Sequence, residues 1–280
     1  MSDPAERIVL VGGHESSEGA QLQRLVTTDR AWVATPTGRR LAHAVESALD
    51  AGQSVTVVPM TLGRDPILIA ETARELRWIR QTRPGRILLA PPFGTTDHLI
   101  AHLRSAANRL MRLSPGAALV IAADASDNFN DAELHRVAHL VRAESSIPEV
   151  TVALLGPGHL ALEDIAHRLE RLGYERSGVV HAGFAAAAHV PDSEPHSMLW
   201  CGPLIRDNAI RRIVTERIAA AQHAAEHGDD GIDPALGADH DHGYAHSHDD
   251  VAGSAHGHGH GHPHSTTAGK DRHGFSQTAV

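Results

Sequence analysis

The chain has little cysteine and few aromatic residues, and each shortage excludes a class of protein. Its 280 residues include one cysteine, Cys201, so neither a disulfide framework nor an all-cysteine zinc or iron–sulfur site can form. We therefore expect a reduced, cytoplasmic protein. Aromatic residues make up 3% of the chain and hydrophobic residues 41%, which predicts a large core of Ala, Val, Leu and Ile.

Basic segments and long apolar runs are also missing. The formal net charge is −9 and the single lysine is Lys270, so nucleic acid is not an expected partner. No apolar run reaches membrane-spanning length and the first residues lack the pattern of a signal peptide, so no membrane association is expected. The first strand-to-helix turn, GGHESSEG, lacks GxxxxGK[ST], GxGxxG and GxSxG. It therefore predicts no nucleoside triphosphate, dinucleotide or activated serine, and no prosthetic group is expected.

Histidine is abundant, and ten of the 23 histidines lie in residues 229–280. In HDHGYAHSHDD and AHGHGHGHPH they are interspersed with Gly, Asp and Ser. This spacing cannot pack a core, but neutral imidazole binds Zn, Co, Ni and Cu. Because regular periodicity stops near Gly228, we predict a disordered tail that acts as a metal reservoir. The predicted reservoir residues are His240, His242, His246, His248, His256, His258, His260, His262 and His264.

Short apolar runs alternate with amphipathic stretches along the rest of the chain, which is typical of an α/β fold with parallel sheets. Strands are expected at 7–12, 31–35, 54–60, 86–92, 118–123, 150–156, 177–183 and 197–202. Helices are expected near 18–26, 37–50, 67–82, 96–112, 130–143, 160–172 and 204–227. The two sets of four strands follow one pattern, so we predict duplicated, flavodoxin-like halves facing each other across a cleft. The predicted divisions are residues 1–114, 115–228 and the tail 229–280.

Ligands of open parallel sheets bind beyond the carboxyl ends of the strands, and the duplication places comparable loops there. In the first half these loops carry His14, Glu15 and Arg64, the last followed by Asp65. In the second half they carry Asp124 and His189. Histidine beside carboxylate suits metal ligation or proton transfer.

These strand ends resemble the class II tetrapyrrole chelatases, the sirohydrochlorin cobaltochelatase group. The family opens with a strand that ends in G-H followed by a small residue and Ser, which GHES at the end of the first strand resembles. HAGFAAAAHVPD matches in spacing the family landmark P-x-F-L-x-x-G-x-H-x-x-D. His189 falls on the landmark histidine, while His181 replaces the Pro. The resemblance covers residues 6–205, including the duplication, and the family also contains chains with histidine-rich segments. It implies ATP-independent insertion of Co²⁺ into sirohydrochlorin or a related precorrin, on the route to cobalamin. Histidines serve as metal ligand and proton acceptor.

The chain departs from the family pattern because neither half keeps both histidines. We therefore hypothesise a composite site of His14 and His189, with Glu15 and Asp124 as auxiliary ligands or proton acceptors and Arg64 pairing with substrate carboxylates. The structural alternatives are a helix-capping His14, a surface His189, a helix-capping Asp124 and a solvated ion pair at Arg64.

Several functional alternatives stay open. Iron insertion for siroheme and nickel insertion use the same ligand types, so Fe²⁺ and Ni²⁺ are alternatives to Co²⁺ as the substrate ion. A non-enzymatic metal store or chaperone and a flavodoxin-like binding module are alternatives of other classes. Because both halves lie on one chain, a monomer is expected.

Overall fold

The computed structural model describes residues 5–27, 30–156, 158–187 and 197–239. Two four-stranded parallel sheets form the fold, with strand orders β2-β1-β3-β4 and β6-β5-β7-β8. The first sheet contains β1 (Glu6–Gly12), β2 (Trp32–Thr35), β3 (Ser54–Met60) and β4 (Ile87–Leu89). The second contains β5 (Ala118–Asp124), β6 (Val150–Leu155), β7 (Arg176–His181) and β8 (Ser197–Trp200). The second order repeats the first, which confirms the predicted α/β class with duplicated halves.

Helices follow the strands at the predicted places. They are α1 (Gln23–Val26), α2 (Arg39–Asp50), α3 (Pro66–Thr82), α4 (Thr96–Leu113), α5 (Asn128–Ala143), α6 (Leu162–Arg171) and α7 (Asp207–Glu226). Two short 3₁₀ turns, η1 (His14–Ser16) and η2 (Ala20–Leu22), precede α1. No helix among the described residues is long and apolar enough to cross a bilayer.

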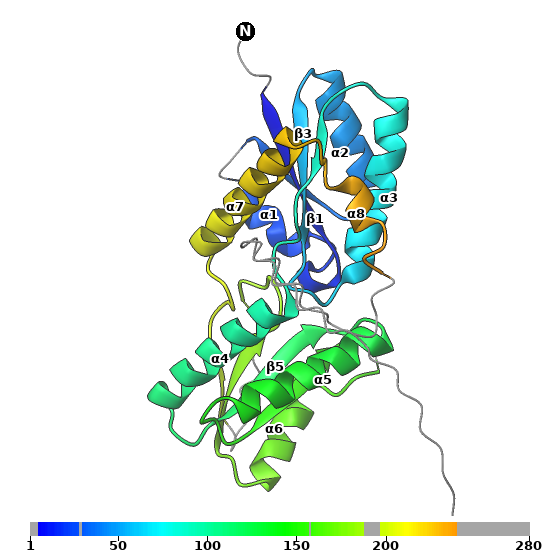
Figure 1. The fold of residues 1–280 in the computed structure, drawn as a ribbon. Helices are drawn as coiled ribbons and strands as arrows, with labels where there is room; N and C mark the ends of the chain where they lie inside the picture. Colours follow the sequence, from blue (N-terminus) through cyan, green and yellow to red (C-terminus); the bar gives the residue numbers. More distant parts are fainter. Residues whose placement is uncertain (1–4, 28–29, 157, 188–196, 240–280) are drawn as a thin grey trace, which may run out of the picture. The chain divides into compact units, whose positions relative to one another are not determined.

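The two sheets exchange a covering helix. α4, which follows the first sheet in the sequence, packs on α5 and β7, whereas α7 packs on β3 and β4 (Figure 1). Ile210 and Val214 of α7 are buried in the same apolar cluster as Ile8 and Leu10 of β1. The predicted division at residue 114 follows the repeat in the sequence, but each sheet takes one helix from the other half.

Apolar residues cover both faces of each sheet, as the continuously hydrophobic strands require. In the first sheet, Val9 and Val57 pack with the buried sides of α2 and α3. In the second sheet, Val120 and Val179 pack with α6. The opposite faces of the two sheets contribute to a single cluster that contains α4, α5 and α7. With both faces of the central strands buried, their residues reach a ligand at the strand ends.

Part of the predicted disordered tail is folded. Residues 229–239 contain the short helix α8 (Ile232–Ala235), and Ile232 is fully buried against the first sheet. The Leu89 N–H donates to the Asp230 carbonyl over 2.8 Å, and Arg80 of α3 pairs with the carboxylates of Asp230 and Asp233. A single isoleucine within a Gly/Asp-rich run gives no periodic signal, so sequence reasoning placed the start of the tail too early. The remaining tail, 240–280, lies outside the described residues.

Candidate functional site at the strand ends

His14 stands immediately beyond β1, where the chain turns into η1. Its Nδ1 lies 3.0 Å from Asp65 Oδ2, and the other oxygen of Asp65 accepts the Leu68 N–H at the start of α3. A carboxylate at Nδ1 favours the tautomer with hydrogen on that nitrogen, which leaves a lone pair on Nε2. Nε2 is buried and has no hydrogen-bond partner among the described residues, so it is the nitrogen of His14 left for a proton or a metal ion that enters the site.

The close approach of His14 and Asp65 depends on the glycine between β1 and η1. A Cβ atom on Gly13 would lie 2.1 Å from Asp65 Oδ2. Any larger residue would therefore displace the carboxylate, which is held in place by its cap of α3. The glycine of the GGH sequence thus has a steric role at the site.

Glu15, the next residue of η1, is buried. Its carboxylate accepts hydrogen bonds from the Thr61 hydroxyl, the Leu62 N–H and the Arg64 N–H. Burial raises the pKa of Glu15, although the nearby Arg64 charge and these hydrogen bonds act in the opposite direction. With its oxygens engaged and 1% of its surface exposed, Glu15 fixes the loop after β3. This geometry disfavours the predicted auxiliary-ligand role.

Arg64 is buried as well, with 1% of its surface exposed. Its Nη1 lies 3.5 Å from the Ala182 carbonyl of the second half, and its Nε and Nη2 have no partner among the described residues. The predicted alternative of a solvated ion pair is therefore wrong, because the guanidinium is not in solvent. Two unsatisfied donors on a buried cation can receive a carboxylate or water.

The second half contributes a histidine–carboxylate pair at its own strand ends. Asp124, the last residue of β5, lies 3.8 Å from Nε2 of His181, the last residue of β7. The Ser17 hydroxyl of the first half donates to Asp124 Oδ2 over 2.7 Å. The interaction with His181 and the Ser17 hydrogen bond lower the pKa of Asp124. Asp127, not Asp124, caps α5 by accepting the Phe129 and Asn130 N–H groups.

The strand-end loops of the two halves touch through their backbones. The Phe184 N–H, just beyond β7, donates to the Glu15 carbonyl over 3.0 Å. Gly183 permits this contact, because a Cβ atom there would lie 2.3 Å from the same carbonyl. His14, Asp65 and Arg64 are thereby brought to the same region as Asp124 and His181.

The loop between η1 and η2 is strained. Ser17 and Glu18 adopt positive φ angles of 48° and 53°, a region that costs free energy for residues other than glycine. This backbone conformation accompanies the hydrogen bond from the Ser17 hydroxyl to Asp124. It also places Glu18 near Asp65 and His14: burial, followed by the Asp65 charge, raises the pKa of Glu18, while His14 lowers it.

Sequence reasoning identified part of this arrangement. His14, Glu15, Arg64 and Asp124 converge as expected from the strand-end rule. The family spacing marks His181 only as a replacement for a landmark proline, although a histidine that ends an apolar strand is itself a signal. His189 and the tail histidines lie outside the described residues, so the composite site of His14 and His189 stays a prediction. Among the residues the structure describes, no three His, Cys, Asp or Glu side chains form a group that could hold a metal ion.

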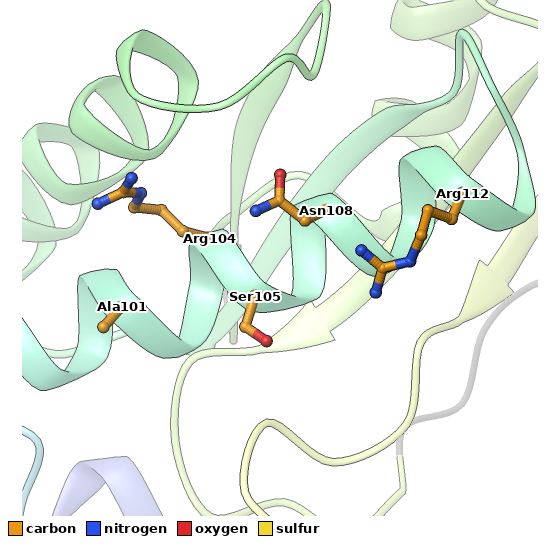
Figure 2. Close-up of a pocket in the computed structure, with 5 residues that line it drawn as sticks. All are labelled: Ala101, Arg104, Ser105, Asn108 and Arg112. Carbon is orange, nitrogen blue, oxygen red and sulfur yellow. The ribbon is translucent and has the colours of Figure 1, made fainter.

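A separate pocket lies away from the strand ends, on the surface of α4 (Figure 2). Its lining residues all come from that helix and include Arg104, Asn108 and Arg112. Arg104 is already paired with Glu144 of the second half at 2.8 Å. The pocket contains none of the predicted site residues and adds no group to the strand-end chemistry.

Comparisons with known proteins define the class of fold. No protein-family model and no curated protein matches the chain. Among solved structures, the chain matches the fold of SirB from Bacillus subtilis. One of the matching structures is SirB from Bacillus subtilis with Fe³⁺, with a TM-score of 0.54 and 14% identity, covering 81% of this chain and 99% of that one. The cobalt complex of the sirohydrochlorin chelatase SirB from Bacillus subtilis subspecies spizizenii matches with a TM-score of 0.48 and 13% identity, over 80% of this chain and 98% of that one. The resemblance predicted from the sequence is confirmed at the level of the fold.

Proposed function

We propose that the protein is a chelatase that inserts a divalent metal ion, foremost Co²⁺, into sirohydrochlorin or a related precorrin without ATP. The observation that carries the proposal is the His14–Asp65 pair, which leaves His14 Nε2 unpartnered at a strand end. The fold shared with SirB, a sirohydrochlorin chelatase, supports the choice of substrate class.

Metal insertion replaces two pyrrole N–H protons by one divalent ion, so two protons must leave the macrocycle. His14 Nε2 accepts one of them, and the Asp65 carboxylate stabilises the imidazolium that forms. The second proton needs a second base. Among the residues that the structure describes, the candidate for this second base is the His181–Asp124 pair. The family spacing gives His189 as the other candidate. Arg64, whose Nε and Nη2 are unsatisfied, would receive a carboxylate of the substrate.

Co²⁺ is proposed first because the resemblance is to cobaltochelatases, on the route to cobalamin. SirB is known in structures with Fe³⁺ and with cobalt. Imidazole and carboxylate also bind Fe²⁺ and Ni²⁺. Competition among equal concentrations of the three ions, read from the distinct products, identifies the preferred ion. A single cytoplasmic chain is proposed to suffice, since it contains both sets of strand ends.

The activity test mixes the full-length protein with sirohydrochlorin and Co²⁺ and follows the absorption spectrum. We expect insertion faster than the uncatalysed rate, lost in His14→Ala and kept in His43→Ala, which removes an exposed histidine of α2. No acceleration by the wild-type protein would overturn the proposal. Full activity of His189→Ala would remove that residue from the site and leave His181 as the second imidazole.

A metal store or chaperone is the second candidate, favoured by the ten histidines of residues 229–280. It predicts several bound Co²⁺ ions per chain without any acceleration of insertion. Replacing the histidines of residues 240–280 separates the roles. For a chelatase, this variant would insert metal at the wild-type rate when the metal is saturating and more slowly when the metal is scarce. For a store, the variant would lose its bound ions, and neither protein would accelerate insertion.

A further inference from the structure

Two histidines at the carboxyl end of α7, His223 in its last turn and His227 as its C-cap, form a pair outside the strand-end site. His223 and His227 are four residues apart, a spacing that puts side chains on one face of a helix. Their rings lie with centroids 4.9 Å apart at an angle of 89°. Both side chains are exposed, so an ion can reach them without any movement of the core.

A carboxylate orients the first of these rings. Glu226 Oε2 lies 3.3 Å from His223 Nδ1. As in the His14–Asp65 pair, a carboxylate at Nδ1 favours hydrogen on that nitrogen and leaves the Nε2 lone pair for a metal ion. The pair also lies at the carboxyl end of a long helix, with His227 as the C-cap. The helix dipole there favours a bound cation.

We propose that His223 and His227 bind one first-row divalent ion, such as Co²⁺ or Ni²⁺, through their Nε2 atoms, with water in the remaining positions. Glu226 acts on His223 without being a ligand. A site of two imidazoles agrees with the absence of three-ligand groups among the described residues. Two neutral ligands and an open coordination sphere make the ion readily exchangeable. This site does not depend on the proposed chelatase activity.

The chain offers a matched comparison on α5. His135 and His139 have the same spacing and are also exposed, but the residue between them that corresponds to Glu226 is Ala138. This second pair has no carboxylate at that position to hold a ring nitrogen protonated. It therefore tests whether spacing alone is sufficient for binding.

The experiment uses the full-length chain with the ten histidines of residues 229–280 replaced by asparagine, which removes competing imidazoles. Co²⁺ is titrated while the imidazole signals of ¹⁵N-labelled histidine are followed, because the paramagnetic ion broadens the rings that bind it. We expect His223 and His227 to broaden first. Affinity at this site should fall at least tenfold in His223→Gln, about tenfold in Glu226→Gln, and remain unchanged in His135→Gln. Broadening of His135 and His139 at the same Co²⁺ concentration, or unchanged affinity in His223→Gln, would overturn the proposal.

Discussion

Asp65 performs two tasks with its two oxygens, and replacing it by asparagine separates them. Oδ1 accepts the Leu68 N–H over 3.0 Å at the start of α3, while Oδ2 lies 3.0 Å from His14 Nδ1. Asparagine caps helices about as well as aspartate, so Asp65→Asn keeps the cap. With Oδ1 still on the Leu68 N–H, the amide NH₂ faces His14 and can only donate. The imidazole hydrogen must then move to Nε2 and block the reactive lone pair.

The expected magnitudes differ for activity and stability. Loss of a carboxylate that orients a metal-binding histidine lowers activity by about 10- to 100-fold. That corresponds to about 1.4–2.7 kcal/mol in the barrier. The free energy of unfolding should change by less than about 0.5 kcal/mol in Asp65→Asn, whereas Asp65→Ala also loses the cap and costs about 1 kcal/mol more.

The assay combines initial rates of Co²⁺ insertion, denaturant unfolding, and ¹⁵N chemical shifts that report the tautomer of His14. Asp164→Asn is the matched control, since Asp164 accepts the Ala161 N–H at the start of α6 without a histidine partner in that bond. We expect the control to keep the wild-type rate. A wild-type rate in Asp65→Asn, or an unchanged tautomer, would refute the assignment of Nε2 as the reactive atom.

Three further predictions concern stability. Glu18→Gly should raise the free energy of unfolding by about 1 kcal/mol, because glycine accepts the positive φ of this position without strain; a decrease in urea denaturation would contradict this. The pKa of Asp124 is lowered from its ordinary value of 3.8, so its contribution to stability is present above that pH and is lost as the pH falls below it. Asp124→Asn should therefore unfold with a shallower acid dependence than the wild type between about pH 2 and 5, and parallel curves would contradict the shift. Ile232→Ala should destabilise the fold by about 2–4 kcal/mol, whereas deleting residues 240–280 should leave the unfolding midpoint unchanged; equal midpoints for both variants would place Ile232 outside the cooperative core.

The sequence predicts the sheets well because buried parallel strands are continuously apolar. Every expected strand is present, with ends that shift by only a few residues. The covering helices are also predicted, since each has an apolar side. Their exchange between the sheets is not predicted. Periodicity shows that a helix has an apolar side, but it does not show which sheet that side covers. The position of Ile210 in the apolar pattern of α7 would be the same whichever sheet the helix covered.

The candidate site is predicted only where chemistry and chain position coincide. His14 is a reactive residue at the end of a strand, which the strand-end rule selects directly. The burial of Arg64 cannot be read from the sequence, because LGRDP looks like an exposed turn. In the fold, Arg64 Nη1 lies against the Ala182 carbonyl of the second half, a contact far apart in the sequence. His181 ends an apolar strand just as His14 follows one, so the same rule could have identified it.

The exchanged helices have a consequence for synthesis of the chain. Strands β1 to β4 leave the ribosome first, yet α7 and α8, which cover parts of both faces of their sheet, are made last. The second sheet can assemble with α4, α5 and α6 while α7 is still inside the ribosome. The half that is translated first is therefore the half completed last, contrary to the usual order in which N-terminal units fold first. Until residue 239 has emerged, the nascent first sheet presents apolar surface that a chaperone could bind.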